Sequence, residues 1–173
     1  MLGSPARPGR LLLFLVDLSG SMGGALMALA QRVALGVLEH AYVKRDRVAM
    51  IAFRAGTAEL LFGPTDRVQR VQRELQAPPL GGTTPLGAGL SLAHQTLTQA
   101  ARRDQAEAQT LVLISDGQAN VSTRPGYPAV LAEVMAAAGG LARIEALRVV
   151  FLDTTERGKH DGPARALARQ LRA

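Results

Sequence analysis

Residues 11–24 read Leu11-Leu12-Leu13-Phe14-Leu15-Val16-Asp17-Leu18-Ser19-Gly20-Ser21-Met22-Gly23-Gly24, and they carry the strongest structural signal in the chain. Its first six residues are all apolar, which is typical of a parallel strand buried between two layers of helices. The strand ends at Asp17, and hydroxyl residues follow at alternate positions, Ser19 and Ser21. Alternate side chains of an extended segment point the same way, so these three can converge. Oxygen ligands of this kind suit Mg²⁺, Mn²⁺ or Ca²⁺.

A second apolar strand, expected over residues 110–115, is also followed by an acid, Asp116. In a doubly wound sheet, ligands bind outside the carboxyl ends of the strands, where the winding direction reverses. If the two strands are neighbours there, Asp17 and Asp116 face one crevice. The loop over residues 78–87 is rich in glycine, proline and hydroxyl groups and precedes a helix. Either Thr83 or Thr84 could cap that helix or face a metal ion.

The rest of the chain predicts one α/β domain in which strands and helices alternate. We expect helices over 24–42, 66–75, 86–102, 128–138 and 161–172, and further strands over 48–53, 58–62 and 145–152. The helix over 24–42 is apolar nearly all round, which predicts that other elements enclose it. Gly139 and Gly140 are expected to end the helix over 128–138. The turn at 55–57 is too short for a parallel crossover, so the strand over 58–62 is expected to be antiparallel.

The segment 17–21, DLSGS, resembles the D-x-S-x-S signature of the von Willebrand factor A domain and its metal-ion-dependent adhesion site. Within that family the chain is most similar to the A domain in the D subunit of magnesium chelatase and in its cobaltochelatase relatives. The supporting segments are RDRVAMIAFR at 45–54, GGTTPL at 81–86 and LISDGQAN at 113–120. The resemblance implies a doubly wound, Rossmann-like three-layer α/β sandwich. Its sheet would be mostly parallel, in the order 3-2-1-4-5, with the third strand antiparallel.

The residues before the first strand predict a flexible arm at 1–10, and the resemblance implies a domain over residues 11–173. Relatives usually have one more strand after the last helix, so we expect the fifth strand to be an open edge. An open edge could pair with a second copy of the chain.

The implied metal site consists of Asp17, Ser19, Ser21, Thr84 and Asp116, with the two aspartates binding directly or through water. It would hold Mg²⁺, or Mn²⁺ or Ca²⁺, and keep one position for an Asp or Glu of a partner protein. The resemblance therefore implies a non-catalytic subunit or domain of a metal chelatase complex. Its partners would be an AAA+ ATPase subunit and a porphyrin-binding subunit. The alternative is an adhesion or assembly module unrelated to tetrapyrroles.

The amino-acid composition narrows the functional classes to which the protein could belong. The chain has 173 residues, 47% of them hydrophobic, and no cysteine, which fits one core and a cytoplasmic protein. A net charge of +6 with only 3% aromatic residues argues against nucleic-acid binding, because bases would lack stacking partners. The apolar run after Arg10 is too short to span a membrane. A haloacid-dehalogenase-like phosphatase is a remote alternative, since it needs a second acid two residues after the first, where this chain has Ser19.

Overall fold

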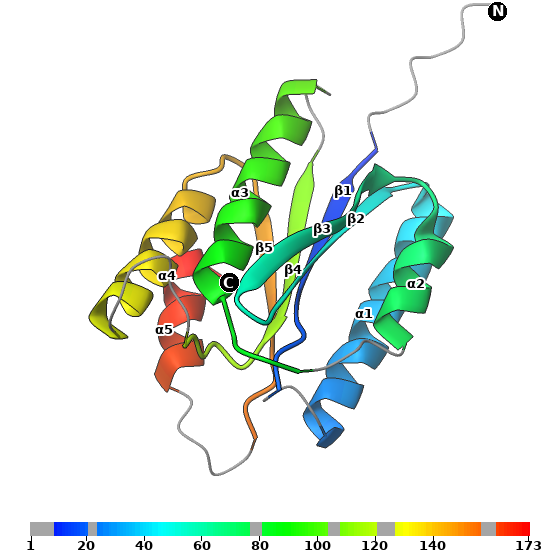
Figure 1. The fold of residues 1–173 in the computed structure, drawn as a ribbon. Coiled ribbons are helices and arrows are strands. Elements are labelled where there is room, and N and C mark those ends of the chain that lie inside the picture. Colours follow the sequence, from blue (N-terminus) through cyan, green and yellow to red (C-terminus); the bar gives the residue numbers. More distant parts are fainter. Residues whose placement is uncertain (1–8, 21–23, 77–80, 104–107, 121–126, 157–161) are drawn as a thin grey trace, which may run out of the picture.

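A five-stranded sheet runs through the middle of the molecule in the order β3-β2-β1-β4-β5 (Figure 1). The computed structural model describes residues 9–20, 24–76, 81–103, 108–120, 127–156 and 162–173. The strands are β1 (Leu11–Asp17), β2 (Arg47–Arg54), β3 (Thr57–Thr65), β4 (Gln109–Ser115) and β5 (Arg148–Asp153). Only β3 runs antiparallel to its neighbour. The predicted strand order and the antiparallel third strand are therefore confirmed.

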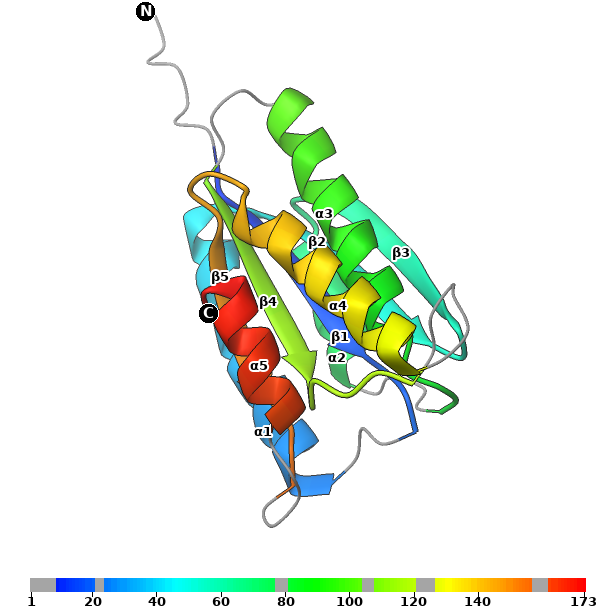
Figure 2. The same ribbon diagram turned by 90° about the vertical axis from the view of Figure 1, so that its left-hand side faces the viewer.

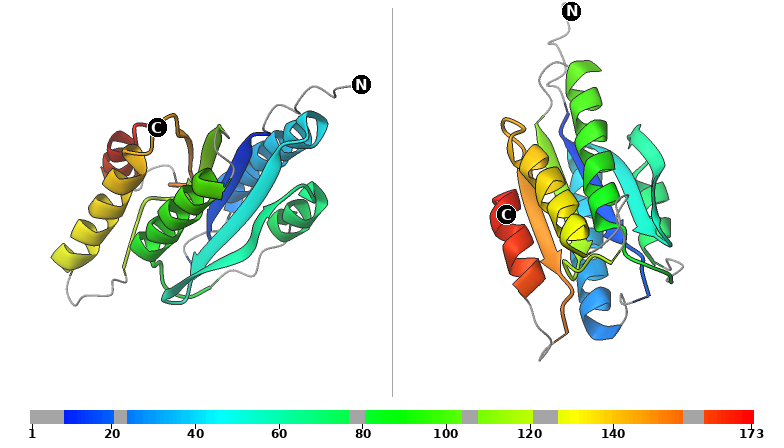
Figure 3. Two further views of the ribbon diagram at one scale, coloured as in Figure 1. Left: turned by 90° about the horizontal axis from the view of Figure 1, so that it is seen from above. Right: turned by 60° about the vertical axis from the view of Figure 1, so that its left-hand side comes forward.

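Helices cover both faces of the sheet (Figures 2 and 3). They are α1 (Gly24–Lys44), α2 (Val68–Gln76), α3 (Leu86–Arg103), α4 (Tyr127–Ala142) and α5 (Gly162–Leu171). One apolar core joins α1 and α2 to one face of the sheet, and a second joins α3, α4 and α5 to the other. The three-layer sandwich that the resemblance implied is confirmed. No helix in the described ranges is long and apolar enough to cross a membrane.

The sequence of β1 shows no alternation of apolar and polar residues, because both faces of this central strand are buried. All seven residues are buried, because the even-numbered apolar side chains enter the first core and the odd-numbered ones enter the second. β1 pairs in parallel with both β2 and β4, and Val16 lies opposite Ile114. The next residues, Asp17 and Ser115, therefore end their strands side by side.

Several sequence expectations differ from the structure; among the strands, β3 runs to Thr65, three residues beyond its expected end. The helix α1 is not enclosed: Leu29 is 48% and Val33 42% exposed, because only one of its faces packs on the sheet. The helix α4 does not end at Gly139 and Gly140 but continues to Ala142, where the buried Leu141 anchors it. Tertiary packing here outweighs the low helix propensity of glycine. The strand β5 begins three residues later than expected, at Arg148.

The two ends of the predicted domain organisation are only partly described. Residues 1–8 of the expected arm lie outside the described residues. Arg10 is held at the start of β1, since its N–H donates to Asp46 and its carbonyl accepts from Arg47. At the other end, β5 pairs with β4 and is the last strand of the sheet in the described part of the chain. Self-association along this edge stays a prediction.

Candidate metal site and family membership

Asp17 ends β1 as a fully buried carboxylate. Its Oδ1 accepts a hydrogen bond from the backbone N–H of Ser19 at 2.8 Å, and its Oδ2 accepts one from the Ser115 hydroxyl at 3.4 Å. Burial raises the pKa of Asp17 to about 6; the bonds from Ser19 oppose this, and the negative charge of Asp116 adds to it. The two carboxylates that were expected at one crevice therefore interact electrostatically.

Asp116 follows β4 in a tight turn. Its Oδ1 accepts a hydrogen bond from the backbone N–H of Gln118 at 3.0 Å, and the residue is only 7% exposed. Gly117 lies between them with φ of 74°, a conformation that favours glycine. The turn keeps Asp116 at the carboxyl end of the sheet beside Asp17.

The loop before α3 is fastened to the loop after β1. The N–H of Gly20 donates to the carbonyl of Gly82 at 3.0 Å, and the N–H of Gly81 donates to the carbonyl of Leu18 at 2.9 Å. Within this loop Thr83 is exposed, whereas Thr84 is buried. Thr84 is thus the threonine that the fold encloses.

The predicted ligands are described to different extents. Asp17, Ser19, Thr84 and Asp116 are all buried at or next to the carboxyl ends of β1 and β4. Ser21 lies outside the described residues, so its place stays a prediction.

Two further residues at this edge, Ser115 and Asn120, were missed from the sequence, and a third, Thr155, was left open between a turn role and a role at the crevice. Ser115 is fully buried; its hydroxyl contacts Asp17 and accepts from the N–H of Gly117 at 3.0 Å. Asn120 is hydrogen-bonded to Thr84. The hydroxyl of Thr155, after β5, lies 3.3 Å from the carbonyl oxygen of Asp116. The signal for Ser115 was available, because a hydroxyl residue that ends a strand directly next to β1, in the register that pairs Val16 with Ile114, lies beside Asp17.

A family model for the von Willebrand factor type A domain matches residues 12–118, which include every predicted ligand. The chain belongs to the von Willebrand factor type A domain family. Membership in this family removes the phosphatase alternative.

Several relatives of this A domain are parts of larger proteins. It is 37% identical to the magnesium-chelatase 67 kDa subunit of Chlorobaculum tepidum over 121 residues, which are 70% of this chain and 19% of that protein. An uncharacterised protein of Mycobacterium tuberculosis is 37% identical over 168 residues, 96% of this chain and 26% of that protein. The A domain thus spans about a fifth to a quarter of these two relatives. An uncharacterised protein of Methanocaldococcus jannaschii is 30% identical and matches 74% of this chain and 71% of its own length.

Solved structures support the fold of the A domain. The A domain of SpRpn10 aligns with a TM-score of 0.64 and 11% identity over 94% of this chain and 82% of that one. BatB from Bacteroides thetaiotaomicron aligns with a TM-score of 0.65 and 17% identity over 95% of this chain and 87% of that one. At these identities the likeness establishes the fold alone.

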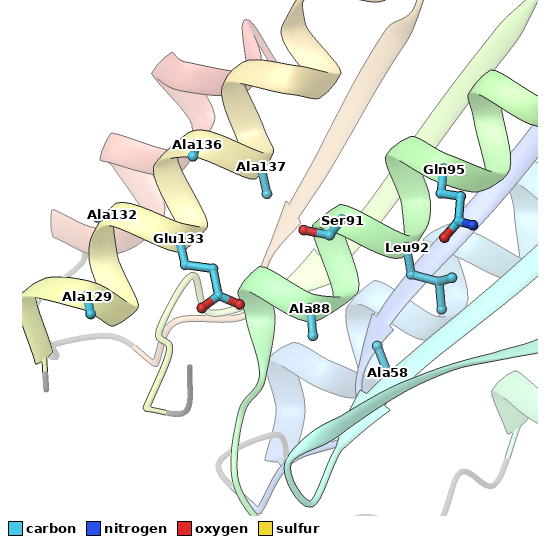
Figure 4. Close-up of a pocket in the computed structure, with 10 residues that line it drawn as sticks. All are labelled: Ala58, Ala88, Ser91, Leu92, Gln95, Ala129, Ala132, Glu133, Ala136 and Ala137. Carbon is cyan, nitrogen blue, oxygen red and sulfur yellow. The ribbon is translucent and has the colours of Figure 1, made fainter. Parts of the chain in front are cut away.

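A separate groove of about 770 Å³ lies along α3, between α4 and β3 (Figure 4). Its lining is mostly alanine, with Glu133 as the one charged side chain among the lining residues. Glu133 reaches over the start of α3, where a Cβ on Gly87 would lie 2.9 Å from its Cγ. None of the predicted metal ligands lines this groove, so it is distinct from the site at the strand ends.

Substituting the glycine beside Asp116 should be costly in this A domain. A Cβ on Gly117 would lie 2.5 Å from the Cα of Ala164 in α5, and the φ of 74° adds backbone strain. We expect Gly117→Ala to lower the free energy of unfolding, measured by urea denaturation, by about 2–4 kcal/mol. This figure adds the cost of a left-handed φ in alanine to the cost of an overpacked contact. The matched control is Gly56→Ala, with φ of 82° and no atom within 4 Å of the added Cβ, which should cost only the strain. Equal losses in the two variants would contradict the steric argument.

Proposed function

We propose that this A domain is a metal-dependent docking module that binds a carboxylate of a partner protein through one divalent cation. The observation that carries the proposal is the pair of buried carboxylates, Asp17 and Asp116, which repel each other at the carboxyl end of the sheet. A cation between them would remove the repulsion and the cost of burying their charge.

The donor set fits a hard cation. Two carboxylates and the buried hydroxyl residues Ser19 and Thr84 supply oxygen only, which suits Mg²⁺, Mn²⁺ or Ca²⁺. Ser21 would add a third hydroxyl. Across the described residues, no three His, Cys, Asp or Glu side chains gather as a metal-binding group. The described residues thus offer the cation few negative charges, and an open coordination position would favour a carboxylate from outside.

The nature of the partner is supported by charge and by similarity. A chain with net charge +6 attracts acidic surfaces, and such attraction speeds association. The similarity to magnesium-chelatase subunits of several bacteria supports a chelatase-type assembly. In that assembly the A domain would act as a non-catalytic element that binds an AAA+ ATPase subunit and a porphyrin-binding subunit.

The docking role can be tested with Mn²⁺ as a paramagnetic probe. Binding of Mn²⁺ to the chelator-treated protein should increase water-proton relaxation, because the ion then tumbles slowly with water still bound to it. Titration with the peptide acetyl-Gly-Asp-Gly-amide should then lower the relaxation, as its carboxylate replaces that water. The matched control is the Asn-containing peptide, which should have little effect. Equal responses to the two peptides, with Mn²⁺ bound, would contradict carboxylate docking.

The alternative, an assembly module unrelated to tetrapyrroles, would use the same site with another partner. Affinity capture from the source cells with and without chelator separates the two functions. Metal-dependent recovery of ATPase and porphyrin-binding subunits supports the chelatase-type assembly. Metal-dependent recovery of other acidic proteins instead would support the general module.

A further inference from the structure

Thr84 has buried backbone groups that no regular element satisfies. It is only 3% exposed, and it precedes Pro85, whose carbonyl accepts the first helical hydrogen bond of α3, from Gly89 at 3.1 Å. The N–H and C=O of Thr84 therefore lie outside the helix. Buried backbone groups of this kind need partners from elsewhere in the chain.

Asn120 supplies both partners. Its side-chain Oδ1 accepts a hydrogen bond from the N–H of Thr84 at 2.7 Å, and its own N–H donates to the carbonyl of Thr84 at 3.3 Å. The two residues are 36 positions apart, so this reciprocal pair connects two separate loops. We call this pair the Asn120 clasp.

The Asn120 clasp joins the two halves of the candidate site. The loop that carries Thr84 is also bonded to the β2–β3 turn, since the carbonyl of Thr83 accepts a hydrogen bond from the N–H of Ala55 at 3.0 Å. Asn120 itself directly follows the turn that holds Asp116. The loop that carries Thr84 is thus held from both sides, and Asn120 sets its distance from the Asp116 turn.

We propose that Asn120 is a positioning residue, which holds the Thr84 hydroxyl where it can act as a metal ligand. This inference rests on the proposed metal site and adds a residue that would not itself touch the metal. Outer residues that orient metal ligands typically contribute about 10- to 100-fold to metal affinity. The clasp holds the backbone of Thr84 and thereby positions its hydroxyl. It should therefore change metal affinity only when that hydroxyl is present.

The test is a double-mutant cycle on Mn²⁺ affinity, measured by electron paramagnetic resonance on the full chain. Asn120→Ala and Thr84→Val should each weaken binding by about 10- to 100-fold. The double variant should bind about as well as Thr84→Val alone, because the clasp has no hydroxyl left to position. Asn120→Asp keeps an acceptor for the Thr84 N–H, so its affinity should be at or above the wild-type value. Gln95→Ala, which removes an exposed amide from α3, is the matched control and should bind normally.

The outcomes separate this inference from the proposed function. If the wild type binds no Mn²⁺, the metal site itself is wrong. If the wild type binds and Asn120→Ala binds equally well, or if the two losses add in the double variant, Asn120 does not act through Thr84. Urea unfolding of each variant without metal shows whether it is folded. Should Asn120→Ala fail to fold, Asn120→Gln displaces the acceptor by one methylene and should lose affinity in the same manner.

Discussion

Millimolar Mg²⁺ is expected to raise the melting temperature of the wild-type chain and to leave that of Asp17→Ala unchanged. A ligand that binds only the folded state stabilises it by about 2.7 kcal/mol at a hundredfold excess over the dissociation constant. For a domain of this size, that corresponds to roughly 5–10 °C. Asp17→Ala removes a fully buried carboxylate of the candidate site, so the gain should vanish. Asp116→Ala should behave the same way.

Thermal unfolding with Mg²⁺, Mn²⁺ or chelator measures this effect. Asp66→Ala serves as the control, because Asp66 is an exposed acid that precedes α2. It should keep the full metal-dependent shift. A wild-type transition that no metal moves would show that the strand-end carboxylates are structural only.

Without metal, Asp17 should make stability fall as the pH rises. Its folded-state pKa of about 6 lies above the ordinary value of 3.8, so the folded protein binds more protons than the unfolded chain between these values. The stability that protonation of Asp17 contributes is complete below pH 3.8 and is lost as the pH rises through 6. The shift corresponds to about 3 kcal/mol over this range.

Asp17→Asn isolates this contribution, because the amide carries no charge at any pH. In chelator the variant should be more stable than the wild type at pH 8, and its advantage should shrink as the pH falls towards 4. Urea unfolding across this range measures the difference. With Mg²⁺ at pH 8 the gap between the two proteins should nearly close, since ligand carboxylates bind metal in their deprotonated form and only the wild type gains stability from the metal. A stability difference that does not change with pH would contradict the raised pKa.

Much of the fold could be predicted because its main signal is local. A run such as Leu11–Val16 can only be buried on both faces, and an acid directly after it must lie at the edge of the sheet. The same reasoning placed Asp116 beside Asp17 once the two strands were taken as neighbours. The strand order itself came from the family resemblance, because no pattern within a strand says which strand it pairs with.

The sequence expectations that were wrong concern features that depend on contacts between residues far apart in the chain. Gly139 and Gly140 have low helix propensity, but the burial of Leu141 carries α4 past them. The apolar α1 was expected to be enclosed, yet Leu29 and Val33 are exposed. The expectation failed because an apolar sequence does not determine how many elements pack around a helix. The Asn120 clasp depends on how two loops meet, which a single sequence does not show.

The central place of β1 has a mechanical consequence. The chain enters β1 at its amino end through Arg10, whereas the candidate docking site lies at its carboxyl end. A pulling force between a tether at the first residues and a partner held at the site would run lengthwise along this strand. β1 is paired in parallel with β4 from Leu11 onward, and Asp116 follows β4. The share of the force that reaches Asp116 would therefore load the β1–β4 ladder in shear, so that its hydrogen bonds would have to break together. In such a linkage, the strand that ends in the candidate ligand Asp17 would also transmit the tension.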